Sequence, residues 1–310
     1  MTLSFTTRIL FSLLISIFAI LNLDAQSDSG VSIMILGIAQ DAGYPQIQCQ
    51  KSCCEKAWND HSLRRMTASL ALLDHKRREF FLIDATPDIK DQLRKVTENF
   101  PYELEGILLT HAHMGHYTGL MHLGREAINA PAIPVYAMPR MKEFLNTNGP
   151  WDQLVTLGNI RLFAIENMTA IQLTENLKVT PFLVPHRDEY SETVGFYIEG
   201  TNRTAWSVPD IDKWHKSNIQ LKEIVEADIA LLDGTFYANG EIPGRNMDEV
   251  PHPFIEETMD EMSSFGIDEK GKVFFTHFNH TNPALWDDST RNRIREKGFN
   301  LAREGQLLRL

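Results

Sequence analysis

Three histidines, His111, His113 and His116, lie within six residues directly after an apolar run. Residues 106–109 are expected to form a short buried strand, and the small residues that follow end it. Because alternate residues project to the same side, His111 and His113 can share one metal ion, while His116 would face a neighbouring ion. Neutral imidazole is a common ligand of zinc and iron. A single buried histidine is usually structural, but three at this spacing favour a metal site.

Three later apolar runs also end in residues that can bind metal, namely His186, Asp210 and His277. Each alone has a simpler explanation, since a histidine after a strand is often structural and an aspartate there is often a turn residue. Together with the first cluster they supply three imidazoles for one ion, two for a second, and a carboxylate to bridge them. We therefore interpret the six residues as one metal centre.

The elements that must position these residues alternate between strands and helices. Strands are expected at 31–36, 69–73, 80–83, 106–109, 134–137, 160–165, 177–184, 194–198, 204–208, 229–232 and 272–275. The second and third should form a hairpin. Helices are expected at 87–96, 117–127, 141–146, 221–225, 253–264 and 290–297. No low-complexity linker interrupts the pattern, which indicates an α/β protein with a mixed sheet.

The composition limits the partners. The chain has 310 residues, enough for a substantial core, and a formal net charge of -11. It has no stripe of lysine or arginine that would follow a phosphate backbone, so nucleic acid is not expected as a partner. A small-molecule substrate is favoured.

The first 25 residues have the pattern of a signal peptide. Arg8 precedes an apolar run at 9–21, and Ala25 is suitably placed for cleavage before Gln26. An uncleaved signal anchor is the alternative, but the apolar run is shorter than the roughly 20 residues of a spanning helix. We expect export to the periplasm or the medium, with residues 26–310 as one domain and no membrane span after cleavage.

The three cysteines, Cys49, Cys53 and Cys54, also lie within six residues. An odd number cannot pair completely within one chain, and a disulfide between adjacent cysteines would be strained. One interpretation is a structural zinc site, for which His61 is a fourth ligand suggested only by its nearness in sequence. The other is a disulfide from Cys49 that leaves one free thiol.

Taken together, these residues resemble the metallo-β-lactamase superfamily, which carries the motif H-x-H-x-D-H. The order of His186, Asp210 and His277, and Asp84 at the end of an early strand, also fit that family. The resemblance implies a four-layer αβ/βα sandwich of two mixed β-sheets flanked by helices, with the metals at the sheet edges. It also implies that Asp84 orients the metal ligands.

Within the superfamily, the chain is most similar to the pyrroloquinoline quinone biosynthesis B proteins. The similarity lies in residues 43–46, which precede the cysteines, and in residues 231–236 and 277–283. It implies that Asp233 orients ligands and that His252 and Asn282 contact substrate. The cysteine spacing departs from the C-x-C-x-x-C pattern of that group, which also tends to have an aspartate in place of His113.

Gly115 stands where the superfamily has a metal-binding aspartate. The second ion would then have one anionic ligand fewer, so we expect a tightly bound first ion and a weaker second ion that Gly115→Asp strengthens. Two histidines are candidates to replace the missing ligand, His252 and His280, although both also have a simpler interpretation as loop residues.

The expected activity is metal-dependent hydrolysis of an ester, lactam, lactone or phosphodiester. One or two zinc ions, with iron as an alternative, would lower the pKa of a bound water toward about 7 and so supply hydroxide. Asp210 would orient that hydroxide or accept its proton, and His280 or the second ion would stabilise the oxyanion.

Two other functions stay open from the sequence. One is an iron-dependent oxidative enzyme like the quinone biosynthesis proteins. The other is a degenerate binding protein that keeps the fold and one ion, which Gly115 suggests. A serine hydrolase is not expected, because the chain has no Gly-x-Ser-x-Gly motif.

Overall fold

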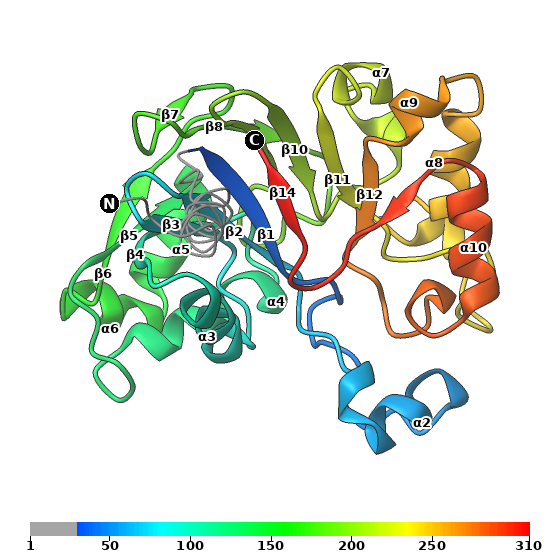
Figure 1. The fold of residues 1–310 in the computed structure, drawn as a ribbon. Coiled ribbons are helices and arrows are strands. Elements are labelled where there is room, and N and C mark those ends of the chain that lie inside the picture. The colour runs from blue at the N-terminus through cyan, green and yellow to red at the C-terminus, as the bar shows by residue number, and fades with distance from the viewer. Residues whose placement is uncertain (1–29) are drawn as a thin grey trace, which may run out of the picture.

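Two seven-stranded sheets lie face to face in the computed structural model, which describes residues 30–310. Helices cover the outer face of each sheet, with α3, α5 and α6 on one side and α8, α9 and α10 on the other (Figure 1). The layers follow the order helix, sheet, sheet, helix. This arrangement confirms the predicted four-layer αβ/βα sandwich.

The first sheet has the strand order β14-β1-β2-β3-β4-β5-β6. Its strands are β1 (Val31–Gly37), β2 (Ser69–Asp74), β3 (Glu79–Ile83), β4 (Glu103–Leu108), β5 (Ile133–Ala137), β6 (Ile160–Ala164) and β14 (Leu307–Arg309). Strands β2 and β3 form the predicted antiparallel hairpin, and β3 to β6 run parallel. The parallel strands are connected through α3 (Ile89–Asn99), α4 (Met114–Tyr117), α5 (Pro139–Thr147) and α6 (Trp151–Thr156).

The second sheet has the order β13-β12-β11-β10-β9-β8-β7. Its strands are β7 (Ile171–Gln172), β8 (Lys178–Leu183), β9 (Val194–Glu199), β10 (Thr204–Val208), β11 (Ile229–Asp233), β12 (Val273–Thr276) and β13 (Asn300–Leu301). Strands β7 to β10 pair antiparallel, and β10 to β13 run parallel. The helices of this half are α7 (Leu221–Ile224), α8 (Ile255–Glu261), α9 (Ile267–Lys270) and α10 (Asp288–Glu296).

Alternating side chains of the first sheet fill two separate cores. On β2, Leu70 and Leu72 belong to the core that includes Phe196 of the second sheet. Ala71 and Leu73, which point the other way, belong to the core beneath α3 and α5. Successive strand residues face opposite sides, so a strand buried on both faces reads as a continuous apolar run. This is why the sequence shows β2 as a strand without polar alternation.

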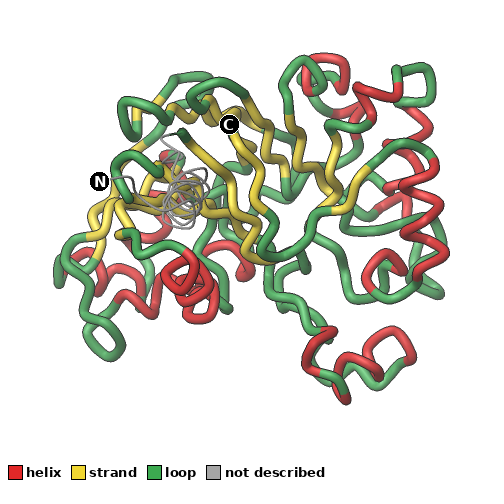
Figure 2. The backbone as a smooth tube through the Cα atoms, in the orientation of Figure 1, coloured by secondary structure: helices red, strands yellow, loops and turns green. Residues whose placement is uncertain are grey.

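Two sequence expectations differ from the structure. The helix expected at 117–127 is instead the short α4 followed by a 3-10 helix at Thr118–Leu123. A Cβ at Gly119 would overlap the carbonyl oxygen of Thr86, so the turn is held close against the loop after β3. Helix α2 (Ser52–Asn59), which carries two of the cysteines, was not expected and lies apart from the two sheets in the backbone trace (Figure 2).

The predicted signal peptide at 1–25 lies outside the described residues. Within residues 30–310, no helix combines the length and the apolar character that crossing a membrane requires.

Candidate metal centre

The loops that follow five strands converge on one cluster of side chains. The loop between β4 and α4 supplies His111 and His113, and α4 itself supplies His116. The other members come from the loops after β1, β8, β10, and β12, and are Asp41, His186, Asp210 and His277. The ends of strands in the two facing sheets thus bring together residues that lie far apart in the sequence.

Asp210 lies at the centre of this cluster. Its Oδ2 atom is 3.1 Å from Nε2 of His116 and 3.2 Å from Nε2 of His277. Its Oδ1 atom is 3.7 Å from Nε2 of His186, and Oδ2 is 4.0 Å from Nε2 of His111. The Asp210 carboxylate therefore faces both halves of the cluster, as expected of a bridging ligand.

The first half comprises His111, His113 and His186, whose ligand atoms lie within 4.8 Å of one another. His111 and His186 are buried, whereas His113 is at the opening of the site and its Nε2 atom is 3.1 Å from Oε2 of Glu189. These are the three imidazoles that the sequence assigned to the first ion, and the structure brings them together.

The second half contains a candidate ligand that the sequence analysis missed. Asp41, from the loop after β1, forms a group with His116 and His277, and its Oδ1 atom is 3.6 Å from Nε2 of His116. The expectation that this group lacks a carboxylate because of Gly115 is therefore corrected. The missing carboxylate group is supplied by a segment about 70 residues earlier in the chain.

The polar atoms of the cluster fit a metal centre. Among described residues, nine buried side-chain nitrogen and oxygen atoms have no hydrogen-bond partner, and two of these belong to Trp151 and Asn159. The other seven belong to Asp41, His111, His116, His186, Asp210 and His277. Burying such atoms without partners is costly unless something binds them. Ligand atoms about 2.0–2.2 Å from a tetrahedral zinc lie roughly 3.4 Å apart, close to the spacings around Asp210.

The protonation states in the cluster also favour a cation. Burial lowers the pKa of His186 to about 4 and lowers the pKa of His111 well below its usual value. Burial alone would raise the pKa of Asp210, but His277 and His116 outweigh it and hold that pKa well below its usual value. His111 and His186 are thus neutral beside an ionised carboxylate, which are the forms that bind metal. At His116 burial alone would lower the pKa, but Asp84 and Asp210 outweigh it and hold that pKa well above its usual value, so a metal ion there would replace a proton.

Two buried aspartates hold the ligands in place. Asp84 accepts a hydrogen bond from the backbone N–H of Thr110 at 2.8 Å, and its Oδ2 atom lies 2.7 Å from Nδ1 of His116. Asp233 accepts from the backbone N–H of Ile211 at 3.1 Å, and its Oδ2 atom lies 2.7 Å from Nδ1 of His252. Both positions are those expected of residues that orient metal ligands.

Two members of the cluster and the aspartate that holds His116 have strained backbones. Asp41, Asp84 and His277 have φ angles of 21°, 66° and 62°, and they are three of the eight described non-glycine residues with positive φ. Such conformations cost about 1–3 kcal/mol each and concentrate at functional sites.

Two residues predicted to contact substrate have other surroundings. His252 is buried and forms a possible ligand group with His186 and Asp210, so it belongs to the metal cluster itself. Asn282 is fully buried, donates to the carbonyl of Gly234 at 2.7 Å and accepts from the N–H of Ala284. Asn282 therefore fixes a turn, and the prediction that it binds substrate is corrected.

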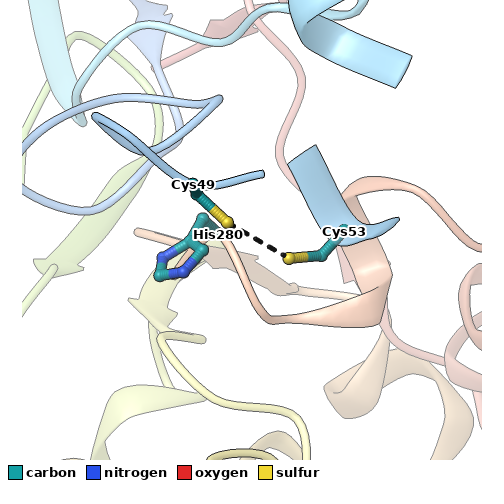
Figure 3. Close-up of side chains that lie close together, drawn as sticks. All are labelled: Cys49, Cys53 and His280. Carbon is teal, nitrogen blue, oxygen red and sulfur yellow. Dashed lines mark hydrogen bonds between the residues drawn. The ribbon is translucent and has the colours of Figure 1, made fainter. Parts of the chain in front are cut away.

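Two of the cysteines lie beside His280, a histidine that was predicted to act in the catalytic cluster. Cys49, Cys53 and His280 offer ligand atoms within 4.8 Å of one another (Figure 3). This placement corrects the prediction that His280 acts in the catalytic cluster. His61, the fourth ligand suggested by the sequence, is exposed and is not a member of this group of three.

The same cysteines are not disulfide-bonded. All three are free, and the Sγ atoms of Cys49 and Cys53 are 3.8 Å apart. Cys54 is fully buried, its Sγ atom is 4.0 Å from that of Cys53, and burial raises its pKa to about 12. The group with His280 does not include Cys54.

Comparison with known proteins agrees with this geometry. The family described as "Beta-lactamase superfamily domain" matches residues 79–278. The chain is 27% identical to coenzyme PQQ synthesis protein B from Methylorubrum extorquens (strain PA1), over 90% of this chain and 99% of that protein.

Two solved structures share the fold. The zinc-bound PqqB from Methylobacterium extorquens has a TM-score of 0.75 and 23% identity, covering 90% of this chain and 100% of that one. A diphosphatase from the PhnP family has a TM-score of 0.67 and 21% identity, covering 91% and 97% of the two chains. At these identities the structures support the architecture.

Proposed function

The chain belongs to the β-lactamase superfamily. From this premise we propose that it is a metal-dependent hydrolase and that phosphodiesters are its preferred substrates. The observation that carries the proposal is the set of unpartnered buried ligand atoms around Asp210. Zinc is the proposed metal, with iron as an alternative, because the donors are imidazoles and carboxylates. Two divalent ions bound here would lower the pKa of a shared water and polarise an ester oxygen.

The chain's own residues have distinct roles in this reaction. Asp210 lies between the two halves of the cluster, so it fixes their separation and orients the attacking water. Asp84 and Asp233 hold His116 and His252 through their Nδ1 atoms, which leaves each Nε2 atom directed away from its aspartate. The most exposed ligands are Asp41 and His113, whose side chains are 29% and 13% exposed. Substrate is therefore expected to approach on their side.

Arg187 supports an anionic substrate. One of its terminal nitrogens lies 3.4 Å from Nε2 of His113, and its side chain is 55% exposed at the opening of the site. A guanidinium in this place can bind a phosphate oxygen that faces the metals. One protein with the same fold is a diphosphatase from the PhnP family.

The proposed activity is tested with bis(p-nitrophenyl) phosphate, p-nitrophenyl acetate and a chromogenic β-lactam on the metal-loaded protein. We expect turnover of the phosphodiester, its loss in Asp210→Ala, and a raised KM with little change in kcat in Arg187→Ala. Lys222→Ala, remote on α7, is the matched control. If a fully loaded protein turns over none of the three, or if Asp210→Ala retains full activity, the proposal is wrong.

A second candidate function is a step in coenzyme PQQ synthesis, favoured by the similarity to the B proteins over 90% of this chain. An iron-dependent oxidation would consume oxygen with turnover, whereas hydrolysis would not. Measuring oxygen uptake with an electrode during turnover separates the two.

The proposal also includes export, because the first 25 residues have the pattern of a signal peptide. Expression of the full chain followed by cell fractionation should give periplasmic or secreted protein that begins near Gln26.

A further inference from the structure

A side chain at position 115 would overlap Asp41. A Cβ atom built on Gly115 would lie 2.6 Å from Oδ1 of Asp41 and closer still to its Cα. Real Cβ atoms essentially never approach other atoms this closely, and one of the two contacts is with main chain, which cannot rotate away. Any residue larger than glycine at position 115 would therefore displace Asp41.

The Asp41 carboxylate is directed at the second half of the cluster. Its Oδ1 atom is buried and has no hydrogen-bond partner, as is also true of Nε2 of His116 and Nε2 of His277. These atoms form one group with ligand-like spacing. Burying an unpartnered carboxylate oxygen beside two unpartnered imidazole nitrogens is costly, and a cation between them would satisfy all three atoms.

The backbone around Asp41 is fixed by another ligand-bearing loop. Gln40 donates its N–H to the carbonyl of Phe278 at 2.9 Å, and Phe278 donates to the carbonyl of Ile38 at 2.7 Å. Phe278 directly follows His277, so the two segments that supply ligands to this half are joined by backbone hydrogen bonds. The Asp41 side chain is thus positioned before any metal binds.

We propose that Asp41 is the carboxylate ligand of the second metal ion and that Gly115 is present to admit it. The two residues form a compensating pair: the aspartate that the superfamily motif has at the start of the α4 segment is replaced by one from the loop after β1. The second ion is then held by Asp41, His116, His277 and the bridging Asp210. This reverses the expectation that Gly115 leaves the second ion weakly bound.

The inference rests on the proposed metal centre but not on hydrolysis, so its test measures metal content. The variants are Asp41→Gly, Gly115→Asp and the double variant that carries both changes, with zinc bound per chain measured by elemental analysis after dialysis and by titration calorimetry. Asp74→Asn, which changes a buried aspartate at the end of β2 that contacts Thr174, is the matched control.

We expect Asp41→Gly to weaken the second ion by more than the 10 to 100-fold typical of removing an outer partner. Gly115→Asp alone should also weaken it, because the new side chain overlaps Asp41. The double variant should bind the second ion no more tightly than Asp41→Gly, because the Cα of residue 41 remains and a Cβ at position 115 would still lie 2.4 Å from it.

The outcomes separate this inference from the proposed function. Wild-type protein that binds no ion in either half overturns both, whereas wild-type protein that binds only the His111 group overturns this inference alone. If Asp41→Gly does not fold, as judged by circular dichroism, Asp41→Asn decides the question, because it keeps the shape and removes the charge. A second ion that binds Asp41→Asn as tightly as wild type overturns the assignment.

Discussion

At the scale of single residues, Asp84 shows how a side chain that binds no metal controls one that does. Its carboxylate contacts Nδ1 of His116 and is itself fixed by the N–H and hydroxyl of Thr110. We predict that Asp84→Asn lowers the affinity of the second ion by about 10 to 100-fold, because the amide no longer fixes the orientation and basicity of the imidazole. Competition with a chromogenic chelator measures this change.

The same measurement on Asp74→Asn provides the comparison. Asp74 is also fully buried and hydrogen-bonded, but to Thr174 and Asn176 rather than to a member of the cluster. Metal affinity should not change in this variant even where stability falls. Equal loss of metal in both variants would mean that Asp84 acts only through the fold.

Glu241 gives a prediction about pH. Burial raises its pKa from 4.5 to about 7, although Thr281 and the backbone N–H of Tyr237 donate hydrogen bonds to it. Because this carboxyl holds its proton more tightly in the folded protein than in the unfolded chain, the free energy of unfolding falls as pH rises from about 4.5 to about 7. At about 1.4 kcal/mol per unit, the loss is up to about 3 kcal/mol.

The variant Glu241→Gln isolates this contribution. We expect the free energy of unfolding of wild type to fall, relative to the variant, between pH 4.5 and pH 7, and the difference to level off above pH 7. Urea denaturation at several pH values measures it. A difference that stays constant across that range would contradict the prediction.

The sequence predicted some residues of the centre better than others, for a physical reason. His111, His113 and His116 share one short segment, and His186, Asp210 and His277 each follow a recognisable strand. Asp41 lies in a loop of small residues after β1, and neither its neighbours nor its spacing marks it as a metal ligand. It becomes a ligand only through contact with α4 and with the loop after β12, which a single sequence does not encode locally.

At the scale of elements, two loops each serve both metal-binding groups. The loop after β1 carries Asp41 toward the histidine cluster and Cys49 toward the cysteines. The loop after β12 carries His277 toward the first and His280 toward the second. The hydrogen bonds of Phe278 join the two loops. A zinc ion held by the cysteine group would therefore tie together the segments that position the second catalytic ion.

This arrangement predicts coupling between the two groups. Cys53→Ser should lower the affinity of the second ion in the histidine cluster by about 10-fold, although no cysteine contacts that ion, because the loops gain freedom. Calorimetric zinc titration of the variant measures the loss. Glu55→Gln, an exposed change on the same helix, should leave the affinity unaltered, and an unaltered affinity in Cys53→Ser would show that the groups are independent.

Elements with strong local patterns were predicted well. The apolar runs of β2, β3 and β9 to β12 identify these segments as strands from the sequence alone. Helix α2 was missed because cysteines and charged residues dominate it, and a helix was expected at 117–127 because that segment has helical spacing. In the structure Gly119 lies in the 3-10 helix that follows α4, close against the loop after β3, and this long-range contact is not revealed by helical spacing.

At the scale of the whole molecule, β14 joins the two halves. It follows β13 of the second sheet along the chain but pairs with β1 of the first sheet. Leu310, directly after it, is buried in the core between the sheets and contacts the position of Gly200 after β9. We predict that Leu310→Ala lowers the free energy of unfolding by about 2–5 kcal/mol, as for other buried leucines.

Leu307 on the same strand is 47% exposed and provides the matched control. Leu307→Ala should change stability by less than about 0.5 kcal/mol. Chemical denaturation of both variants measures the difference. A similar small effect for both would mean that β14 does not stabilise the contact between the two sheets.

The account depends on a centre of two metals in which Asp41 is a ligand, and a zinc anomalous-difference map from crystals of the zinc-loaded protein tests this most directly. We predict two peaks beside Asp210, one among His111, His113 and His186, and one within about 2.0–2.2 Å of an Asp41 oxygen. A third peak is expected between Cys49, Cys53 and His280. A single peak at the His111 group, with the Asp41 carboxylate bound to no ion, would contradict the account.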